Sequence, residues 1–99
     1  MSSPYTRALQ TAAVISRKTG LEIKIETDLH EWLPDLSFQY NTKVYSINAA
    51  KECTQYKGAC PAGAQDAWED LSAVANRAYR ALSPYGAYRK IIVVSHGVV

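Results

Sequence analysis

Polar and apolar residues alternate at helical spacing near the N-terminus, where the apolar positions are Tyr5, Ala8, Leu9, Ala12 and Ile15. This period predicts an amphipathic helix. Ser3 followed by Pro4 predicts its start, because a serine side chain can accept an unpaired N–H and proline fits the first helical position. We therefore expect the helix to begin near Pro4 and to end at Thr19-Gly20, where glycine can adopt a left-handed cap.

Two further stretches predict strands. Leu21, Ile23 and Ile25 alternate with charged residues, which is typical of a half-buried strand at the edge of a sheet. Residues 91–94 are instead four consecutive aliphatic residues, the pattern of a strand covered on both faces. The two patterns predict an α/β fold, a three-layer sandwich in which a parallel sheet has helices on both faces.

A second long helix is expected between Gln65 and about Ser83, where Pro84 cannot continue it and Gly86 supports a turn. Its apolar positions recur at helical spacing, at Trp68, Leu71, Val74, Ala75, Ala78, Tyr79 and Leu82. The same spacing turns four charged side chains outward, those of Glu69, Asp70, Arg77 and Arg80.

Residues 33–64 show no sustained period. So long a loop inside a compact domain is uncommon unless it is functional or has short elements of its own. We interpret it as an insertion that contains one or two short helices, including Ser46 to Tyr56, and that covers or borders a site. Its aromatic residues have a plainer alternative role, which is to anchor the insertion to the body of the domain.

Composition narrows the class of protein. Ninety-nine residues with 47% hydrophobic and 20% charged content favour one globular domain. A net charge of +2 with scattered basic residues argues against nucleic acid as a partner. No apolar run approaches the roughly 18 residues of a membrane span, and no export pattern begins the chain, so we expect a cytoplasmic protein without a membrane partner. Cys53 and Cys60 could close a short disulfide, but the cytoplasm would keep both thiols reduced. A structural zinc site needs a second pair of ligands, which the sequence lacks, so we expect neither a metal nor a cofactor.

Two residues carry candidate chemistry. Arg7 lies in the first turn of the expected N-terminal helix, where a cation is unfavourable unless an anion sits between it and the unpaired N–H groups. His96 follows the aliphatic run, at the carboxyl end of a strand, which is where open α/β sheets bind ligands. Each residue has an alternative reading: Arg7 as a solvated surface arginine, and His96 as a packing or capping residue.

Three motifs in order and approximate spacing resemble the histidine phosphatase superfamily, also called phosphoglycerate mutase-like. They are Ser3-Pro4-Tyr5-Thr6-Arg7-Ala8-Leu9-Gln10-Thr11-Ala12, then Leu29-His30-Glu31-Trp32, then Val93-Val94-Ser95-His96-Gly97. The resemblance runs from Ser2 to the last residue and is loose between Leu33 and Ala64. It implies one partial domain, residues 1–99, with a variable insertion at about 33–64.

The resemblance also implies a function: hydrolysis or transfer at phosphomonoesters through a phosphohistidine, in a pocket of two arginines and two histidines. Matched by motif, Arg7 resembles the second pocket arginine, which binds the phosphoryl oxygens. Glu31 resembles the acid that protonates the leaving oxygen, although an exposed loop carboxylate is its alternative reading. His96 resembles the second, non-nucleophilic histidine. The implied ligand is a phosphorylated small molecule or inorganic phosphate.

The sequence departs from the family because it contains no Arg-His-Gly motif, which supplies the nucleophilic histidine and the first pocket arginine. We therefore expect an interior fragment of a family domain, incomplete in its sheet and inactive alone. The strand at 91–94 would lack a neighbour, which predicts self-association through an unpaired sheet edge. Two alternatives remain open: a non-catalytic phosphate-binding or protein-interaction module, and an unrelated small α/β domain with accidental motif matches.

Overall fold

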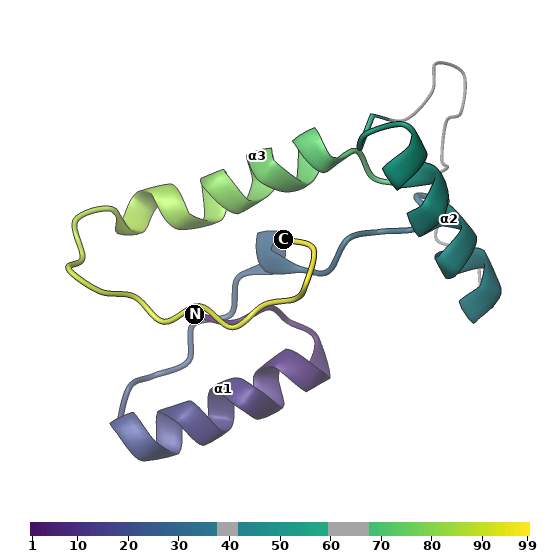
Figure 1. Ribbon diagram of the computed structural model, residues 1–99. Helices are drawn as coiled ribbons and strands as arrows, with labels where there is room; N and C mark the ends of the chain where they lie inside the picture. The colour runs from purple at the N-terminus through teal and green to yellow at the C-terminus, as the bar shows by residue number, and fades with distance from the viewer. Residues whose placement is uncertain (38–41, 60–67) are drawn as a thin grey trace. The chain divides into compact units, whose positions relative to one another are not determined.

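The computed structural model describes residues 1–37, 42–59 and 68–99. Its elements follow the order α1 (Thr6–Thr19), η1 (Thr27–Leu29), α2 (Lys43–Gln55), α3 (Leu71–Leu82) and η2 (Ser83–Tyr85) (Figure 1). The chain divides into two compact units. Unit 1 comprises Met1–Glu31 and Asn76–Val99, and unit 2 comprises Trp32–Ala75.

Helix α1 begins at Thr6, two residues after the predicted start. Tyr5 is its N-cap, with an extended backbone and no side-chain cap hydrogen bond. Ser3, the predicted cap, is engaged elsewhere, because its Oγ lies 2.8 Å from His96 Nε2. The predicted end is confirmed: Gly20 adopts a left-handed φ of 74° and its N–H donates to Ser16 O.

The predicted parallel sheet is wrong. In the described part of the chain, Ser2 forms two isolated parallel bridges, one with Ile25 and one with Val94, and no longer strand is present. The middle segment has room for only three residues, since Pro4 has no N–H to donate and α1 begins at Thr6. The described architecture is therefore helical, with short extended segments side by side, and the three-layer α/β expectation is not met.

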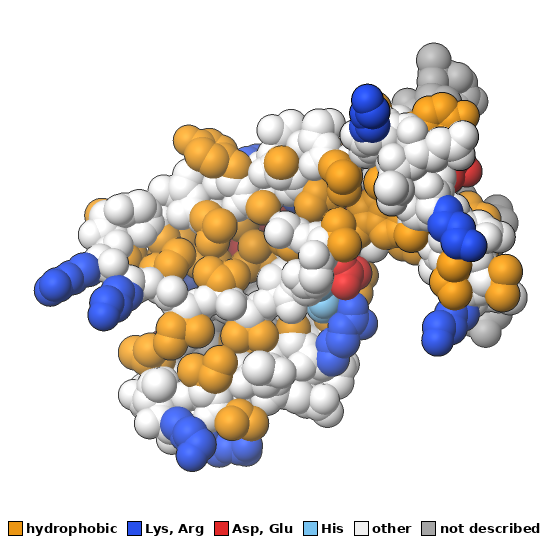
Figure 2. Space-filling model, in the orientation of Figure 1, with side chains coloured by type: hydrophobic (Ala, Val, Ile, Leu, Met, Phe, Trp, Pro, Cys, Tyr) orange, Lys and Arg blue, Asp and Glu red, His pale blue; other side chains and the backbone are white. Residues whose placement is uncertain are grey.

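In the described part of the chain, neither stretch that predicted a strand forms one: residues 21–25, predicted as a half-buried edge strand, and residues 91–94, predicted as covered on both faces. Leu21, Ile23 and Ile25 are 56%, 39% and 59% exposed, and the first three residues of the run at 91–94 are 39–44% exposed. Apolar side chains accordingly appear on the face drawn in Figure 2. The exposure of residues 21–25 is near that of a half-buried strand, whereas residues 91–93 are less covered than a strand enclosed on both faces would be.

Helix α3 ends as predicted and begins later. Its last residue is Leu82, and Pro84 follows within η2. It begins at Leu71, whereas the predicted helix also included residues 68–70, which are not helical, and residues 65–67, which lie outside the described part. Asp70 and Arg80 are partly or fully exposed, but the outward placement predicted for Glu69 and Arg77 is wrong, because only 7% and 4% of these residues are exposed.

In unit 2, α2 confirms the short helix predicted within the insertion and begins three residues earlier, at Lys43. Its buried face, Ala49 and Cys53, packs with Trp68, and Trp32 lies against this cluster. Trp32 and Trp68 flank the insertion and are not part of it, and its own described aromatic residues, Tyr45 and Tyr56, are 38% and 46% exposed. An anchoring role for the aromatic residues of the insertion therefore stays a prediction. Phe38, Tyr40 and Cys60 fall outside the described residues, and a role beside a site stays a prediction.

Candidate functional site

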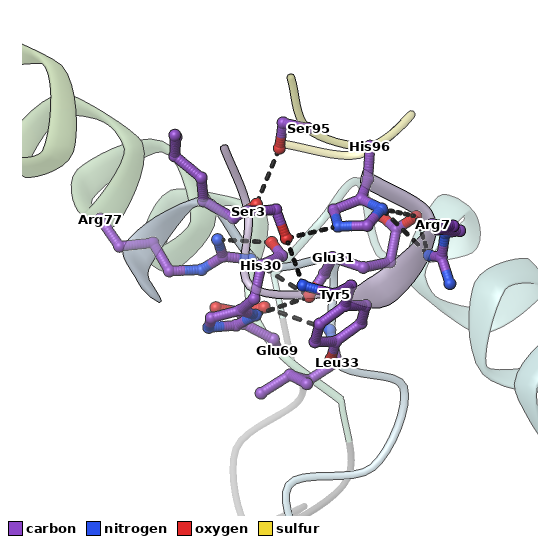
Figure 3. A network of polar contacts seen from close by, with 11 residues as sticks. Ser3, Tyr5, Arg7, His30, Glu31, Leu33, Glu69, Arg77, Ser95 and His96 are labelled. Carbon is purple, nitrogen blue, oxygen red and sulfur yellow. Dashed lines mark hydrogen bonds and ion pairs between the residues drawn. The ribbon is translucent and has the colours of Figure 1, made fainter. Parts of the chain in front are cut away.

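Three residues far apart in the sequence, Arg7, Glu31 and His96, come together in unit 1 (Figure 3). Arg7 Nη2 lies 3.4 Å from Glu31 Oε2 and 3.0 Å from His96 Nδ1. The third side of the triangle, from His96 Nδ1 to Glu31 Oε2, measures 3.7 Å. The structure thus brings together all three of the predicted site residues.

Each side chain reaches the cluster from a different element. Arg7 is the second residue of α1, and its guanidinium lies over the Tyr5 ring, 5.4 Å from the centroid. Glu31 follows η1 by two residues. His96 follows Val94, the residue that bridges to Ser2. The bridge therefore brings the C-terminal segment alongside the residues that lead into α1.

The imidazole of His96 is enclosed, with 2% of its side chain exposed. The Tyr5 ring meets it edge-on at 5.0 Å between centroids. Since the Arg7 guanidinium can only donate, Nδ1 of His96 must accept, which puts the proton of the neutral ring on Nε2. That N–H donates to Ser3 Oγ at 2.8 Å. Ser3 is fully buried and fixes the orientation of the ring, whereas the tautomer follows from the contact with Arg7.

Electrostatics keep His96 neutral. Burial lowers the pKa of His96 below 6.5, Glu31 opposes this by raising it, and the cationic Arg7 lowers it further, as do His30 and Arg77. Desolvation is the largest of these effects. An anion placed beside the ring would act in the same direction as Glu31, so anion binding and proton uptake are coupled here.

The cluster opens to solvent on the Arg7 side. The side chains of Arg7 and Glu31 are 63% and 29% exposed. An open depression lies next to them, at the start of α1, lined by Pro4, Tyr5, Thr6, Arg7 and Gln10. No acidic residue occupies the first turn of α1. A cation beside an uncompensated helix N-terminus can bind an oxyanion, and Glu31 adds a carboxyl group at the same place.

Two residues of this region were missed by the sequence reasoning. Ser3 was assigned to helix capping, and nothing in its spacing pointed to His96. Arg77 was placed on the outer face of its helix, yet it lies on the buried stripe between Val74 and Ala81, which are 5% and 4% exposed. The spacing 74, 77, 81 was a usable signal, because residues three and four apart share one face of a helix.

The second histidine of the chain, His30, is used locally. Its Nδ1 lies 2.7 Å from the carbonyl oxygen of the next residue, Glu31. Among residues 1–37, 42–59 and 68–99, no group of three histidine, cysteine or acidic side chains is placed to hold a metal ion. Within the same ranges, no helix is both long and apolar enough to cross a bilayer.

Comparison with protein families gives one match. The model of the histidine phosphatase superfamily (branch 1) matches residues 1–99. Neither the search of curated proteins nor that of solved structures returned a match. The matched range contains Arg7, Glu31 and His96.

Proposed function

The chain belongs to the histidine phosphatase superfamily, and from that premise we propose that Arg7, Glu31 and His96 form one side of a pocket for the phosphoryl group of a phosphomonoester. The observation that carries this proposal is the position of Arg7 Nη2. It contacts both other residues while it lies in the first turn of a helix that has no acidic residue there. A phosphoryl oxygen can take the place of Glu31 Oε2 or His96 Nδ1 and accept the hydrogen bond that Arg7 Nη2 now donates to that atom.

Each residue then has one role. Arg7 binds non-bridging oxygens, for which a planar guanidinium is suited. His96 takes a proton on Nδ1, which changes this atom from an acceptor of the Arg7 N–H into a donor to the phosphoryl group. Glu31, in its protonated form, donates to the oxygen that leaves. The 99 residues contain no Arg-His-Gly motif, and we propose that this chain alone binds phosphate without turning over a phosphomonoester.

The test is a titration of the isotopically labelled chain with inorganic phosphate, followed by NMR, together with an assay of aryl phosphate hydrolysis. We expect shifts centred on the side chains of Arg7 and His96, and hydrolysis no faster than in buffer. The control is chloride at equal ionic strength. Shifts scattered over the surface lysines would contradict the pocket, and a phosphorylated histidine trapped on the chain would contradict the absence of turnover.

A second candidate function, a protein-interaction module, is favoured by one observation on the extended segment at 91–94. Backbone groups of Ile92 and Val94 pair with the segment Met1–Ser3. Ile91 and Val93 alternate with them and make no backbone hydrogen bond within the described residues. An edge with unpaired N–H and C=O groups is a template for another strand. We propose that a second copy pairs antiparallel to it, since the run at 91–94 then lies opposite itself.

Self-association is tested by analytical ultracentrifugation over a range of concentrations. We expect the parent chain to dimerise. Val93→Lys should remain monomeric, because it places a charge between the two paired copies of the aliphatic run at 91–94. Val14→Lys is the matched control, since Val14 is similarly exposed, at 45%, but belongs to α1 and not to the segment at 91–94. A parent chain that stays monomeric at every concentration would rule out the edge as a dimer interface.

A further inference from the structure

A buried arginine contacts the turn that carries Glu31 into the proposed pocket. Arg77 of α3 is 4% exposed, and its guanidinium points at the turn that leads to Glu31 (Figure 3). Its Nη1 donates to Asp28 O at 2.6 Å and to His30 O at 2.8 Å, and its Nη2 donates to Glu31 O at 3.5 Å. A buried cation is costly unless its donors are satisfied, so these carbonyl oxygens account for the position of the side chain.

A second side chain completes the set. Ser95 Oγ donates to Leu29 O at 2.7 Å. Arg77 and Ser95, which we call the carbonyl clamp, therefore bind the carbonyl oxygens of four successive residues, 28 to 31. One donor comes from α3 and the other from the residue next to His96, so two separate segments fix the same turn.

The turn needs such support because its own structure is small. Element η1 is three residues long, its C-cap His30 has an extended backbone, and Glu31 comes after this cap. The side chain of Glu31 lies 3.4 Å from Arg7 Nη2 and 3.7 Å from His96 Nδ1. Because 63% of the Arg7 side chain is exposed and the His96 ring is neutral, neither contact is strong enough to impose a backbone conformation. The conformation of the main chain therefore contributes to the position of the Glu31 carboxylate.

We propose that Arg77 is a positioning residue: by binding the carbonyl oxygens of the turn, it places the Glu31 carboxylate against Arg7 and His96. This inference rests on the proposed phosphoryl pocket for its functional meaning. It assigns Arg77 no contact with the phosphoryl group. Its positioning effect passes through Glu31 and is separate from the effect of its charge, which lowers the pKa of His96.

A double-mutant cycle measures that dependence. In the parent chain, Glu31→Gln removes a carboxylate that competes for Arg7, so inorganic phosphate should bind about threefold more tightly, which corresponds to well under 1 kcal/mol. If Arg77 places Glu31, the same change should alter the affinity by less than about 1.3-fold in an Arg77→Met background. A general loss of stability would leave the ratio intact in the molecules that remain folded.

Arg80→Met is the matched control. Arg80 is also on α3 and reaches the same turn, but through the side chain of Asp28, at 3.3 Å, and with 67% of its own side chain exposed. The threefold effect of Glu31→Gln should persist in this background. If Arg77→Met does not fold, Arg77→Lys replaces it. The ammonium group keeps the charge but lacks the planar fork by which two guanidinium nitrogens reach three carbonyl oxygens, so the ratio should fall to about half. An undiminished ratio in the folded Arg77 variant overturns the proposal.

A second readout needs no phosphate and separates the two proposals. Nuclear Overhauser effects between the side-chain protons of Glu31 and the ring protons of His96 report the distance between these two side chains. We expect the effects to weaken in Arg77→Met and to keep their intensity in Arg80→Met. If phosphate fails to bind the parent chain but this difference is present, the pocket is wrong and the positioning role stands. Equal intensities in both variants overturn the positioning role.

Discussion

Arg7→Met should weaken the binding of inorganic phosphate by roughly tenfold or more. The change removes the only guanidinium that contacts both Glu31 and His96 within the described chain. Hydrogen bonds to charged groups contribute about 1.5–3 kcal/mol, and about 1.4 kcal/mol is a factor of ten. Because the side chain is 63% exposed, we expect the lower end of that range. Isothermal titration at low ionic strength measures the change directly.

Stability should hardly change in the same variant. The ion pair between Arg7 and Glu31 is exposed, so its loss should lower the free energy of unfolding by less than about 1 kcal/mol. Arg17→Met is the matched control, since Arg17 occupies the last turn of the same helix. It makes the same change in net charge without touching the cluster. Equal losses of affinity in the two variants would show that phosphate responds to net charge alone and would contradict the pocket.

Local signals in the sequence predicted the ends of two helices correctly. Gly20 and Pro84 end α1 and α3 where the sequence predicts, because a left-handed cap and a missing N–H act within one turn of helix. The three motif residues also converge as the family resemblance implies. These predictions depend on chemistry that the local sequence contains, or on a pattern that spans the whole family.

The failures concern what covers a segment. An aliphatic run such as 91–94 indicates that a strand tolerates burial on both faces, but it does not indicate which segment covers it. Here the described residues leave Ile91, Ile92 and Val93 39–44% exposed. The outward placement of Arg77 failed for the opposite reason. Charge predicted exposure, whereas the carbonyl oxygens of a turn 46 to 49 residues away provide a buried site for a guanidinium. Only tertiary structure reveals that site.

The pH dependence of anion binding should identify His96 as the proton acceptor. Sulfate is the suitable probe, since it does not titrate near neutral pH. In the unbound protein, burial first and the neighbouring cations second lower the pKa of His96 below 6.5, and only Glu31 raises it. Arg7, His30 and Arg77 are the cations or potential cations around the ring. The unbound ring is therefore neutral at pH 7.

Bound sulfate adds negative charge beside Nδ1 and raises the pKa of His96 in the complex. The complex then binds more protons than the unbound protein, so affinity must increase as pH falls. The increase begins near the pKa of the complex and levels off below the pKa of the unbound protein, which lies under 6.5. Between these limits the slope approaches tenfold per pH unit for one proton. Titration in buffers of different ionisation enthalpy measures the proton taken up.

His96→Gln should abolish this slope while it keeps a side chain that can donate to Ser3 Oγ. His30→Gln is the matched control and should retain the slope, because the Nδ1 of His30 is bonded to the carbonyl oxygen of Glu31 and does not face Arg7 through any contact of the described chain. If the slope survives in His96→Gln and disappears in His30→Gln, then His30 is the residue that takes up the proton. The assignment of His96 Nδ1 as the atom that changes from acceptor to donor would then be wrong. That assignment requires a contact with Arg7, which His96 makes and His30 does not make within the described chain.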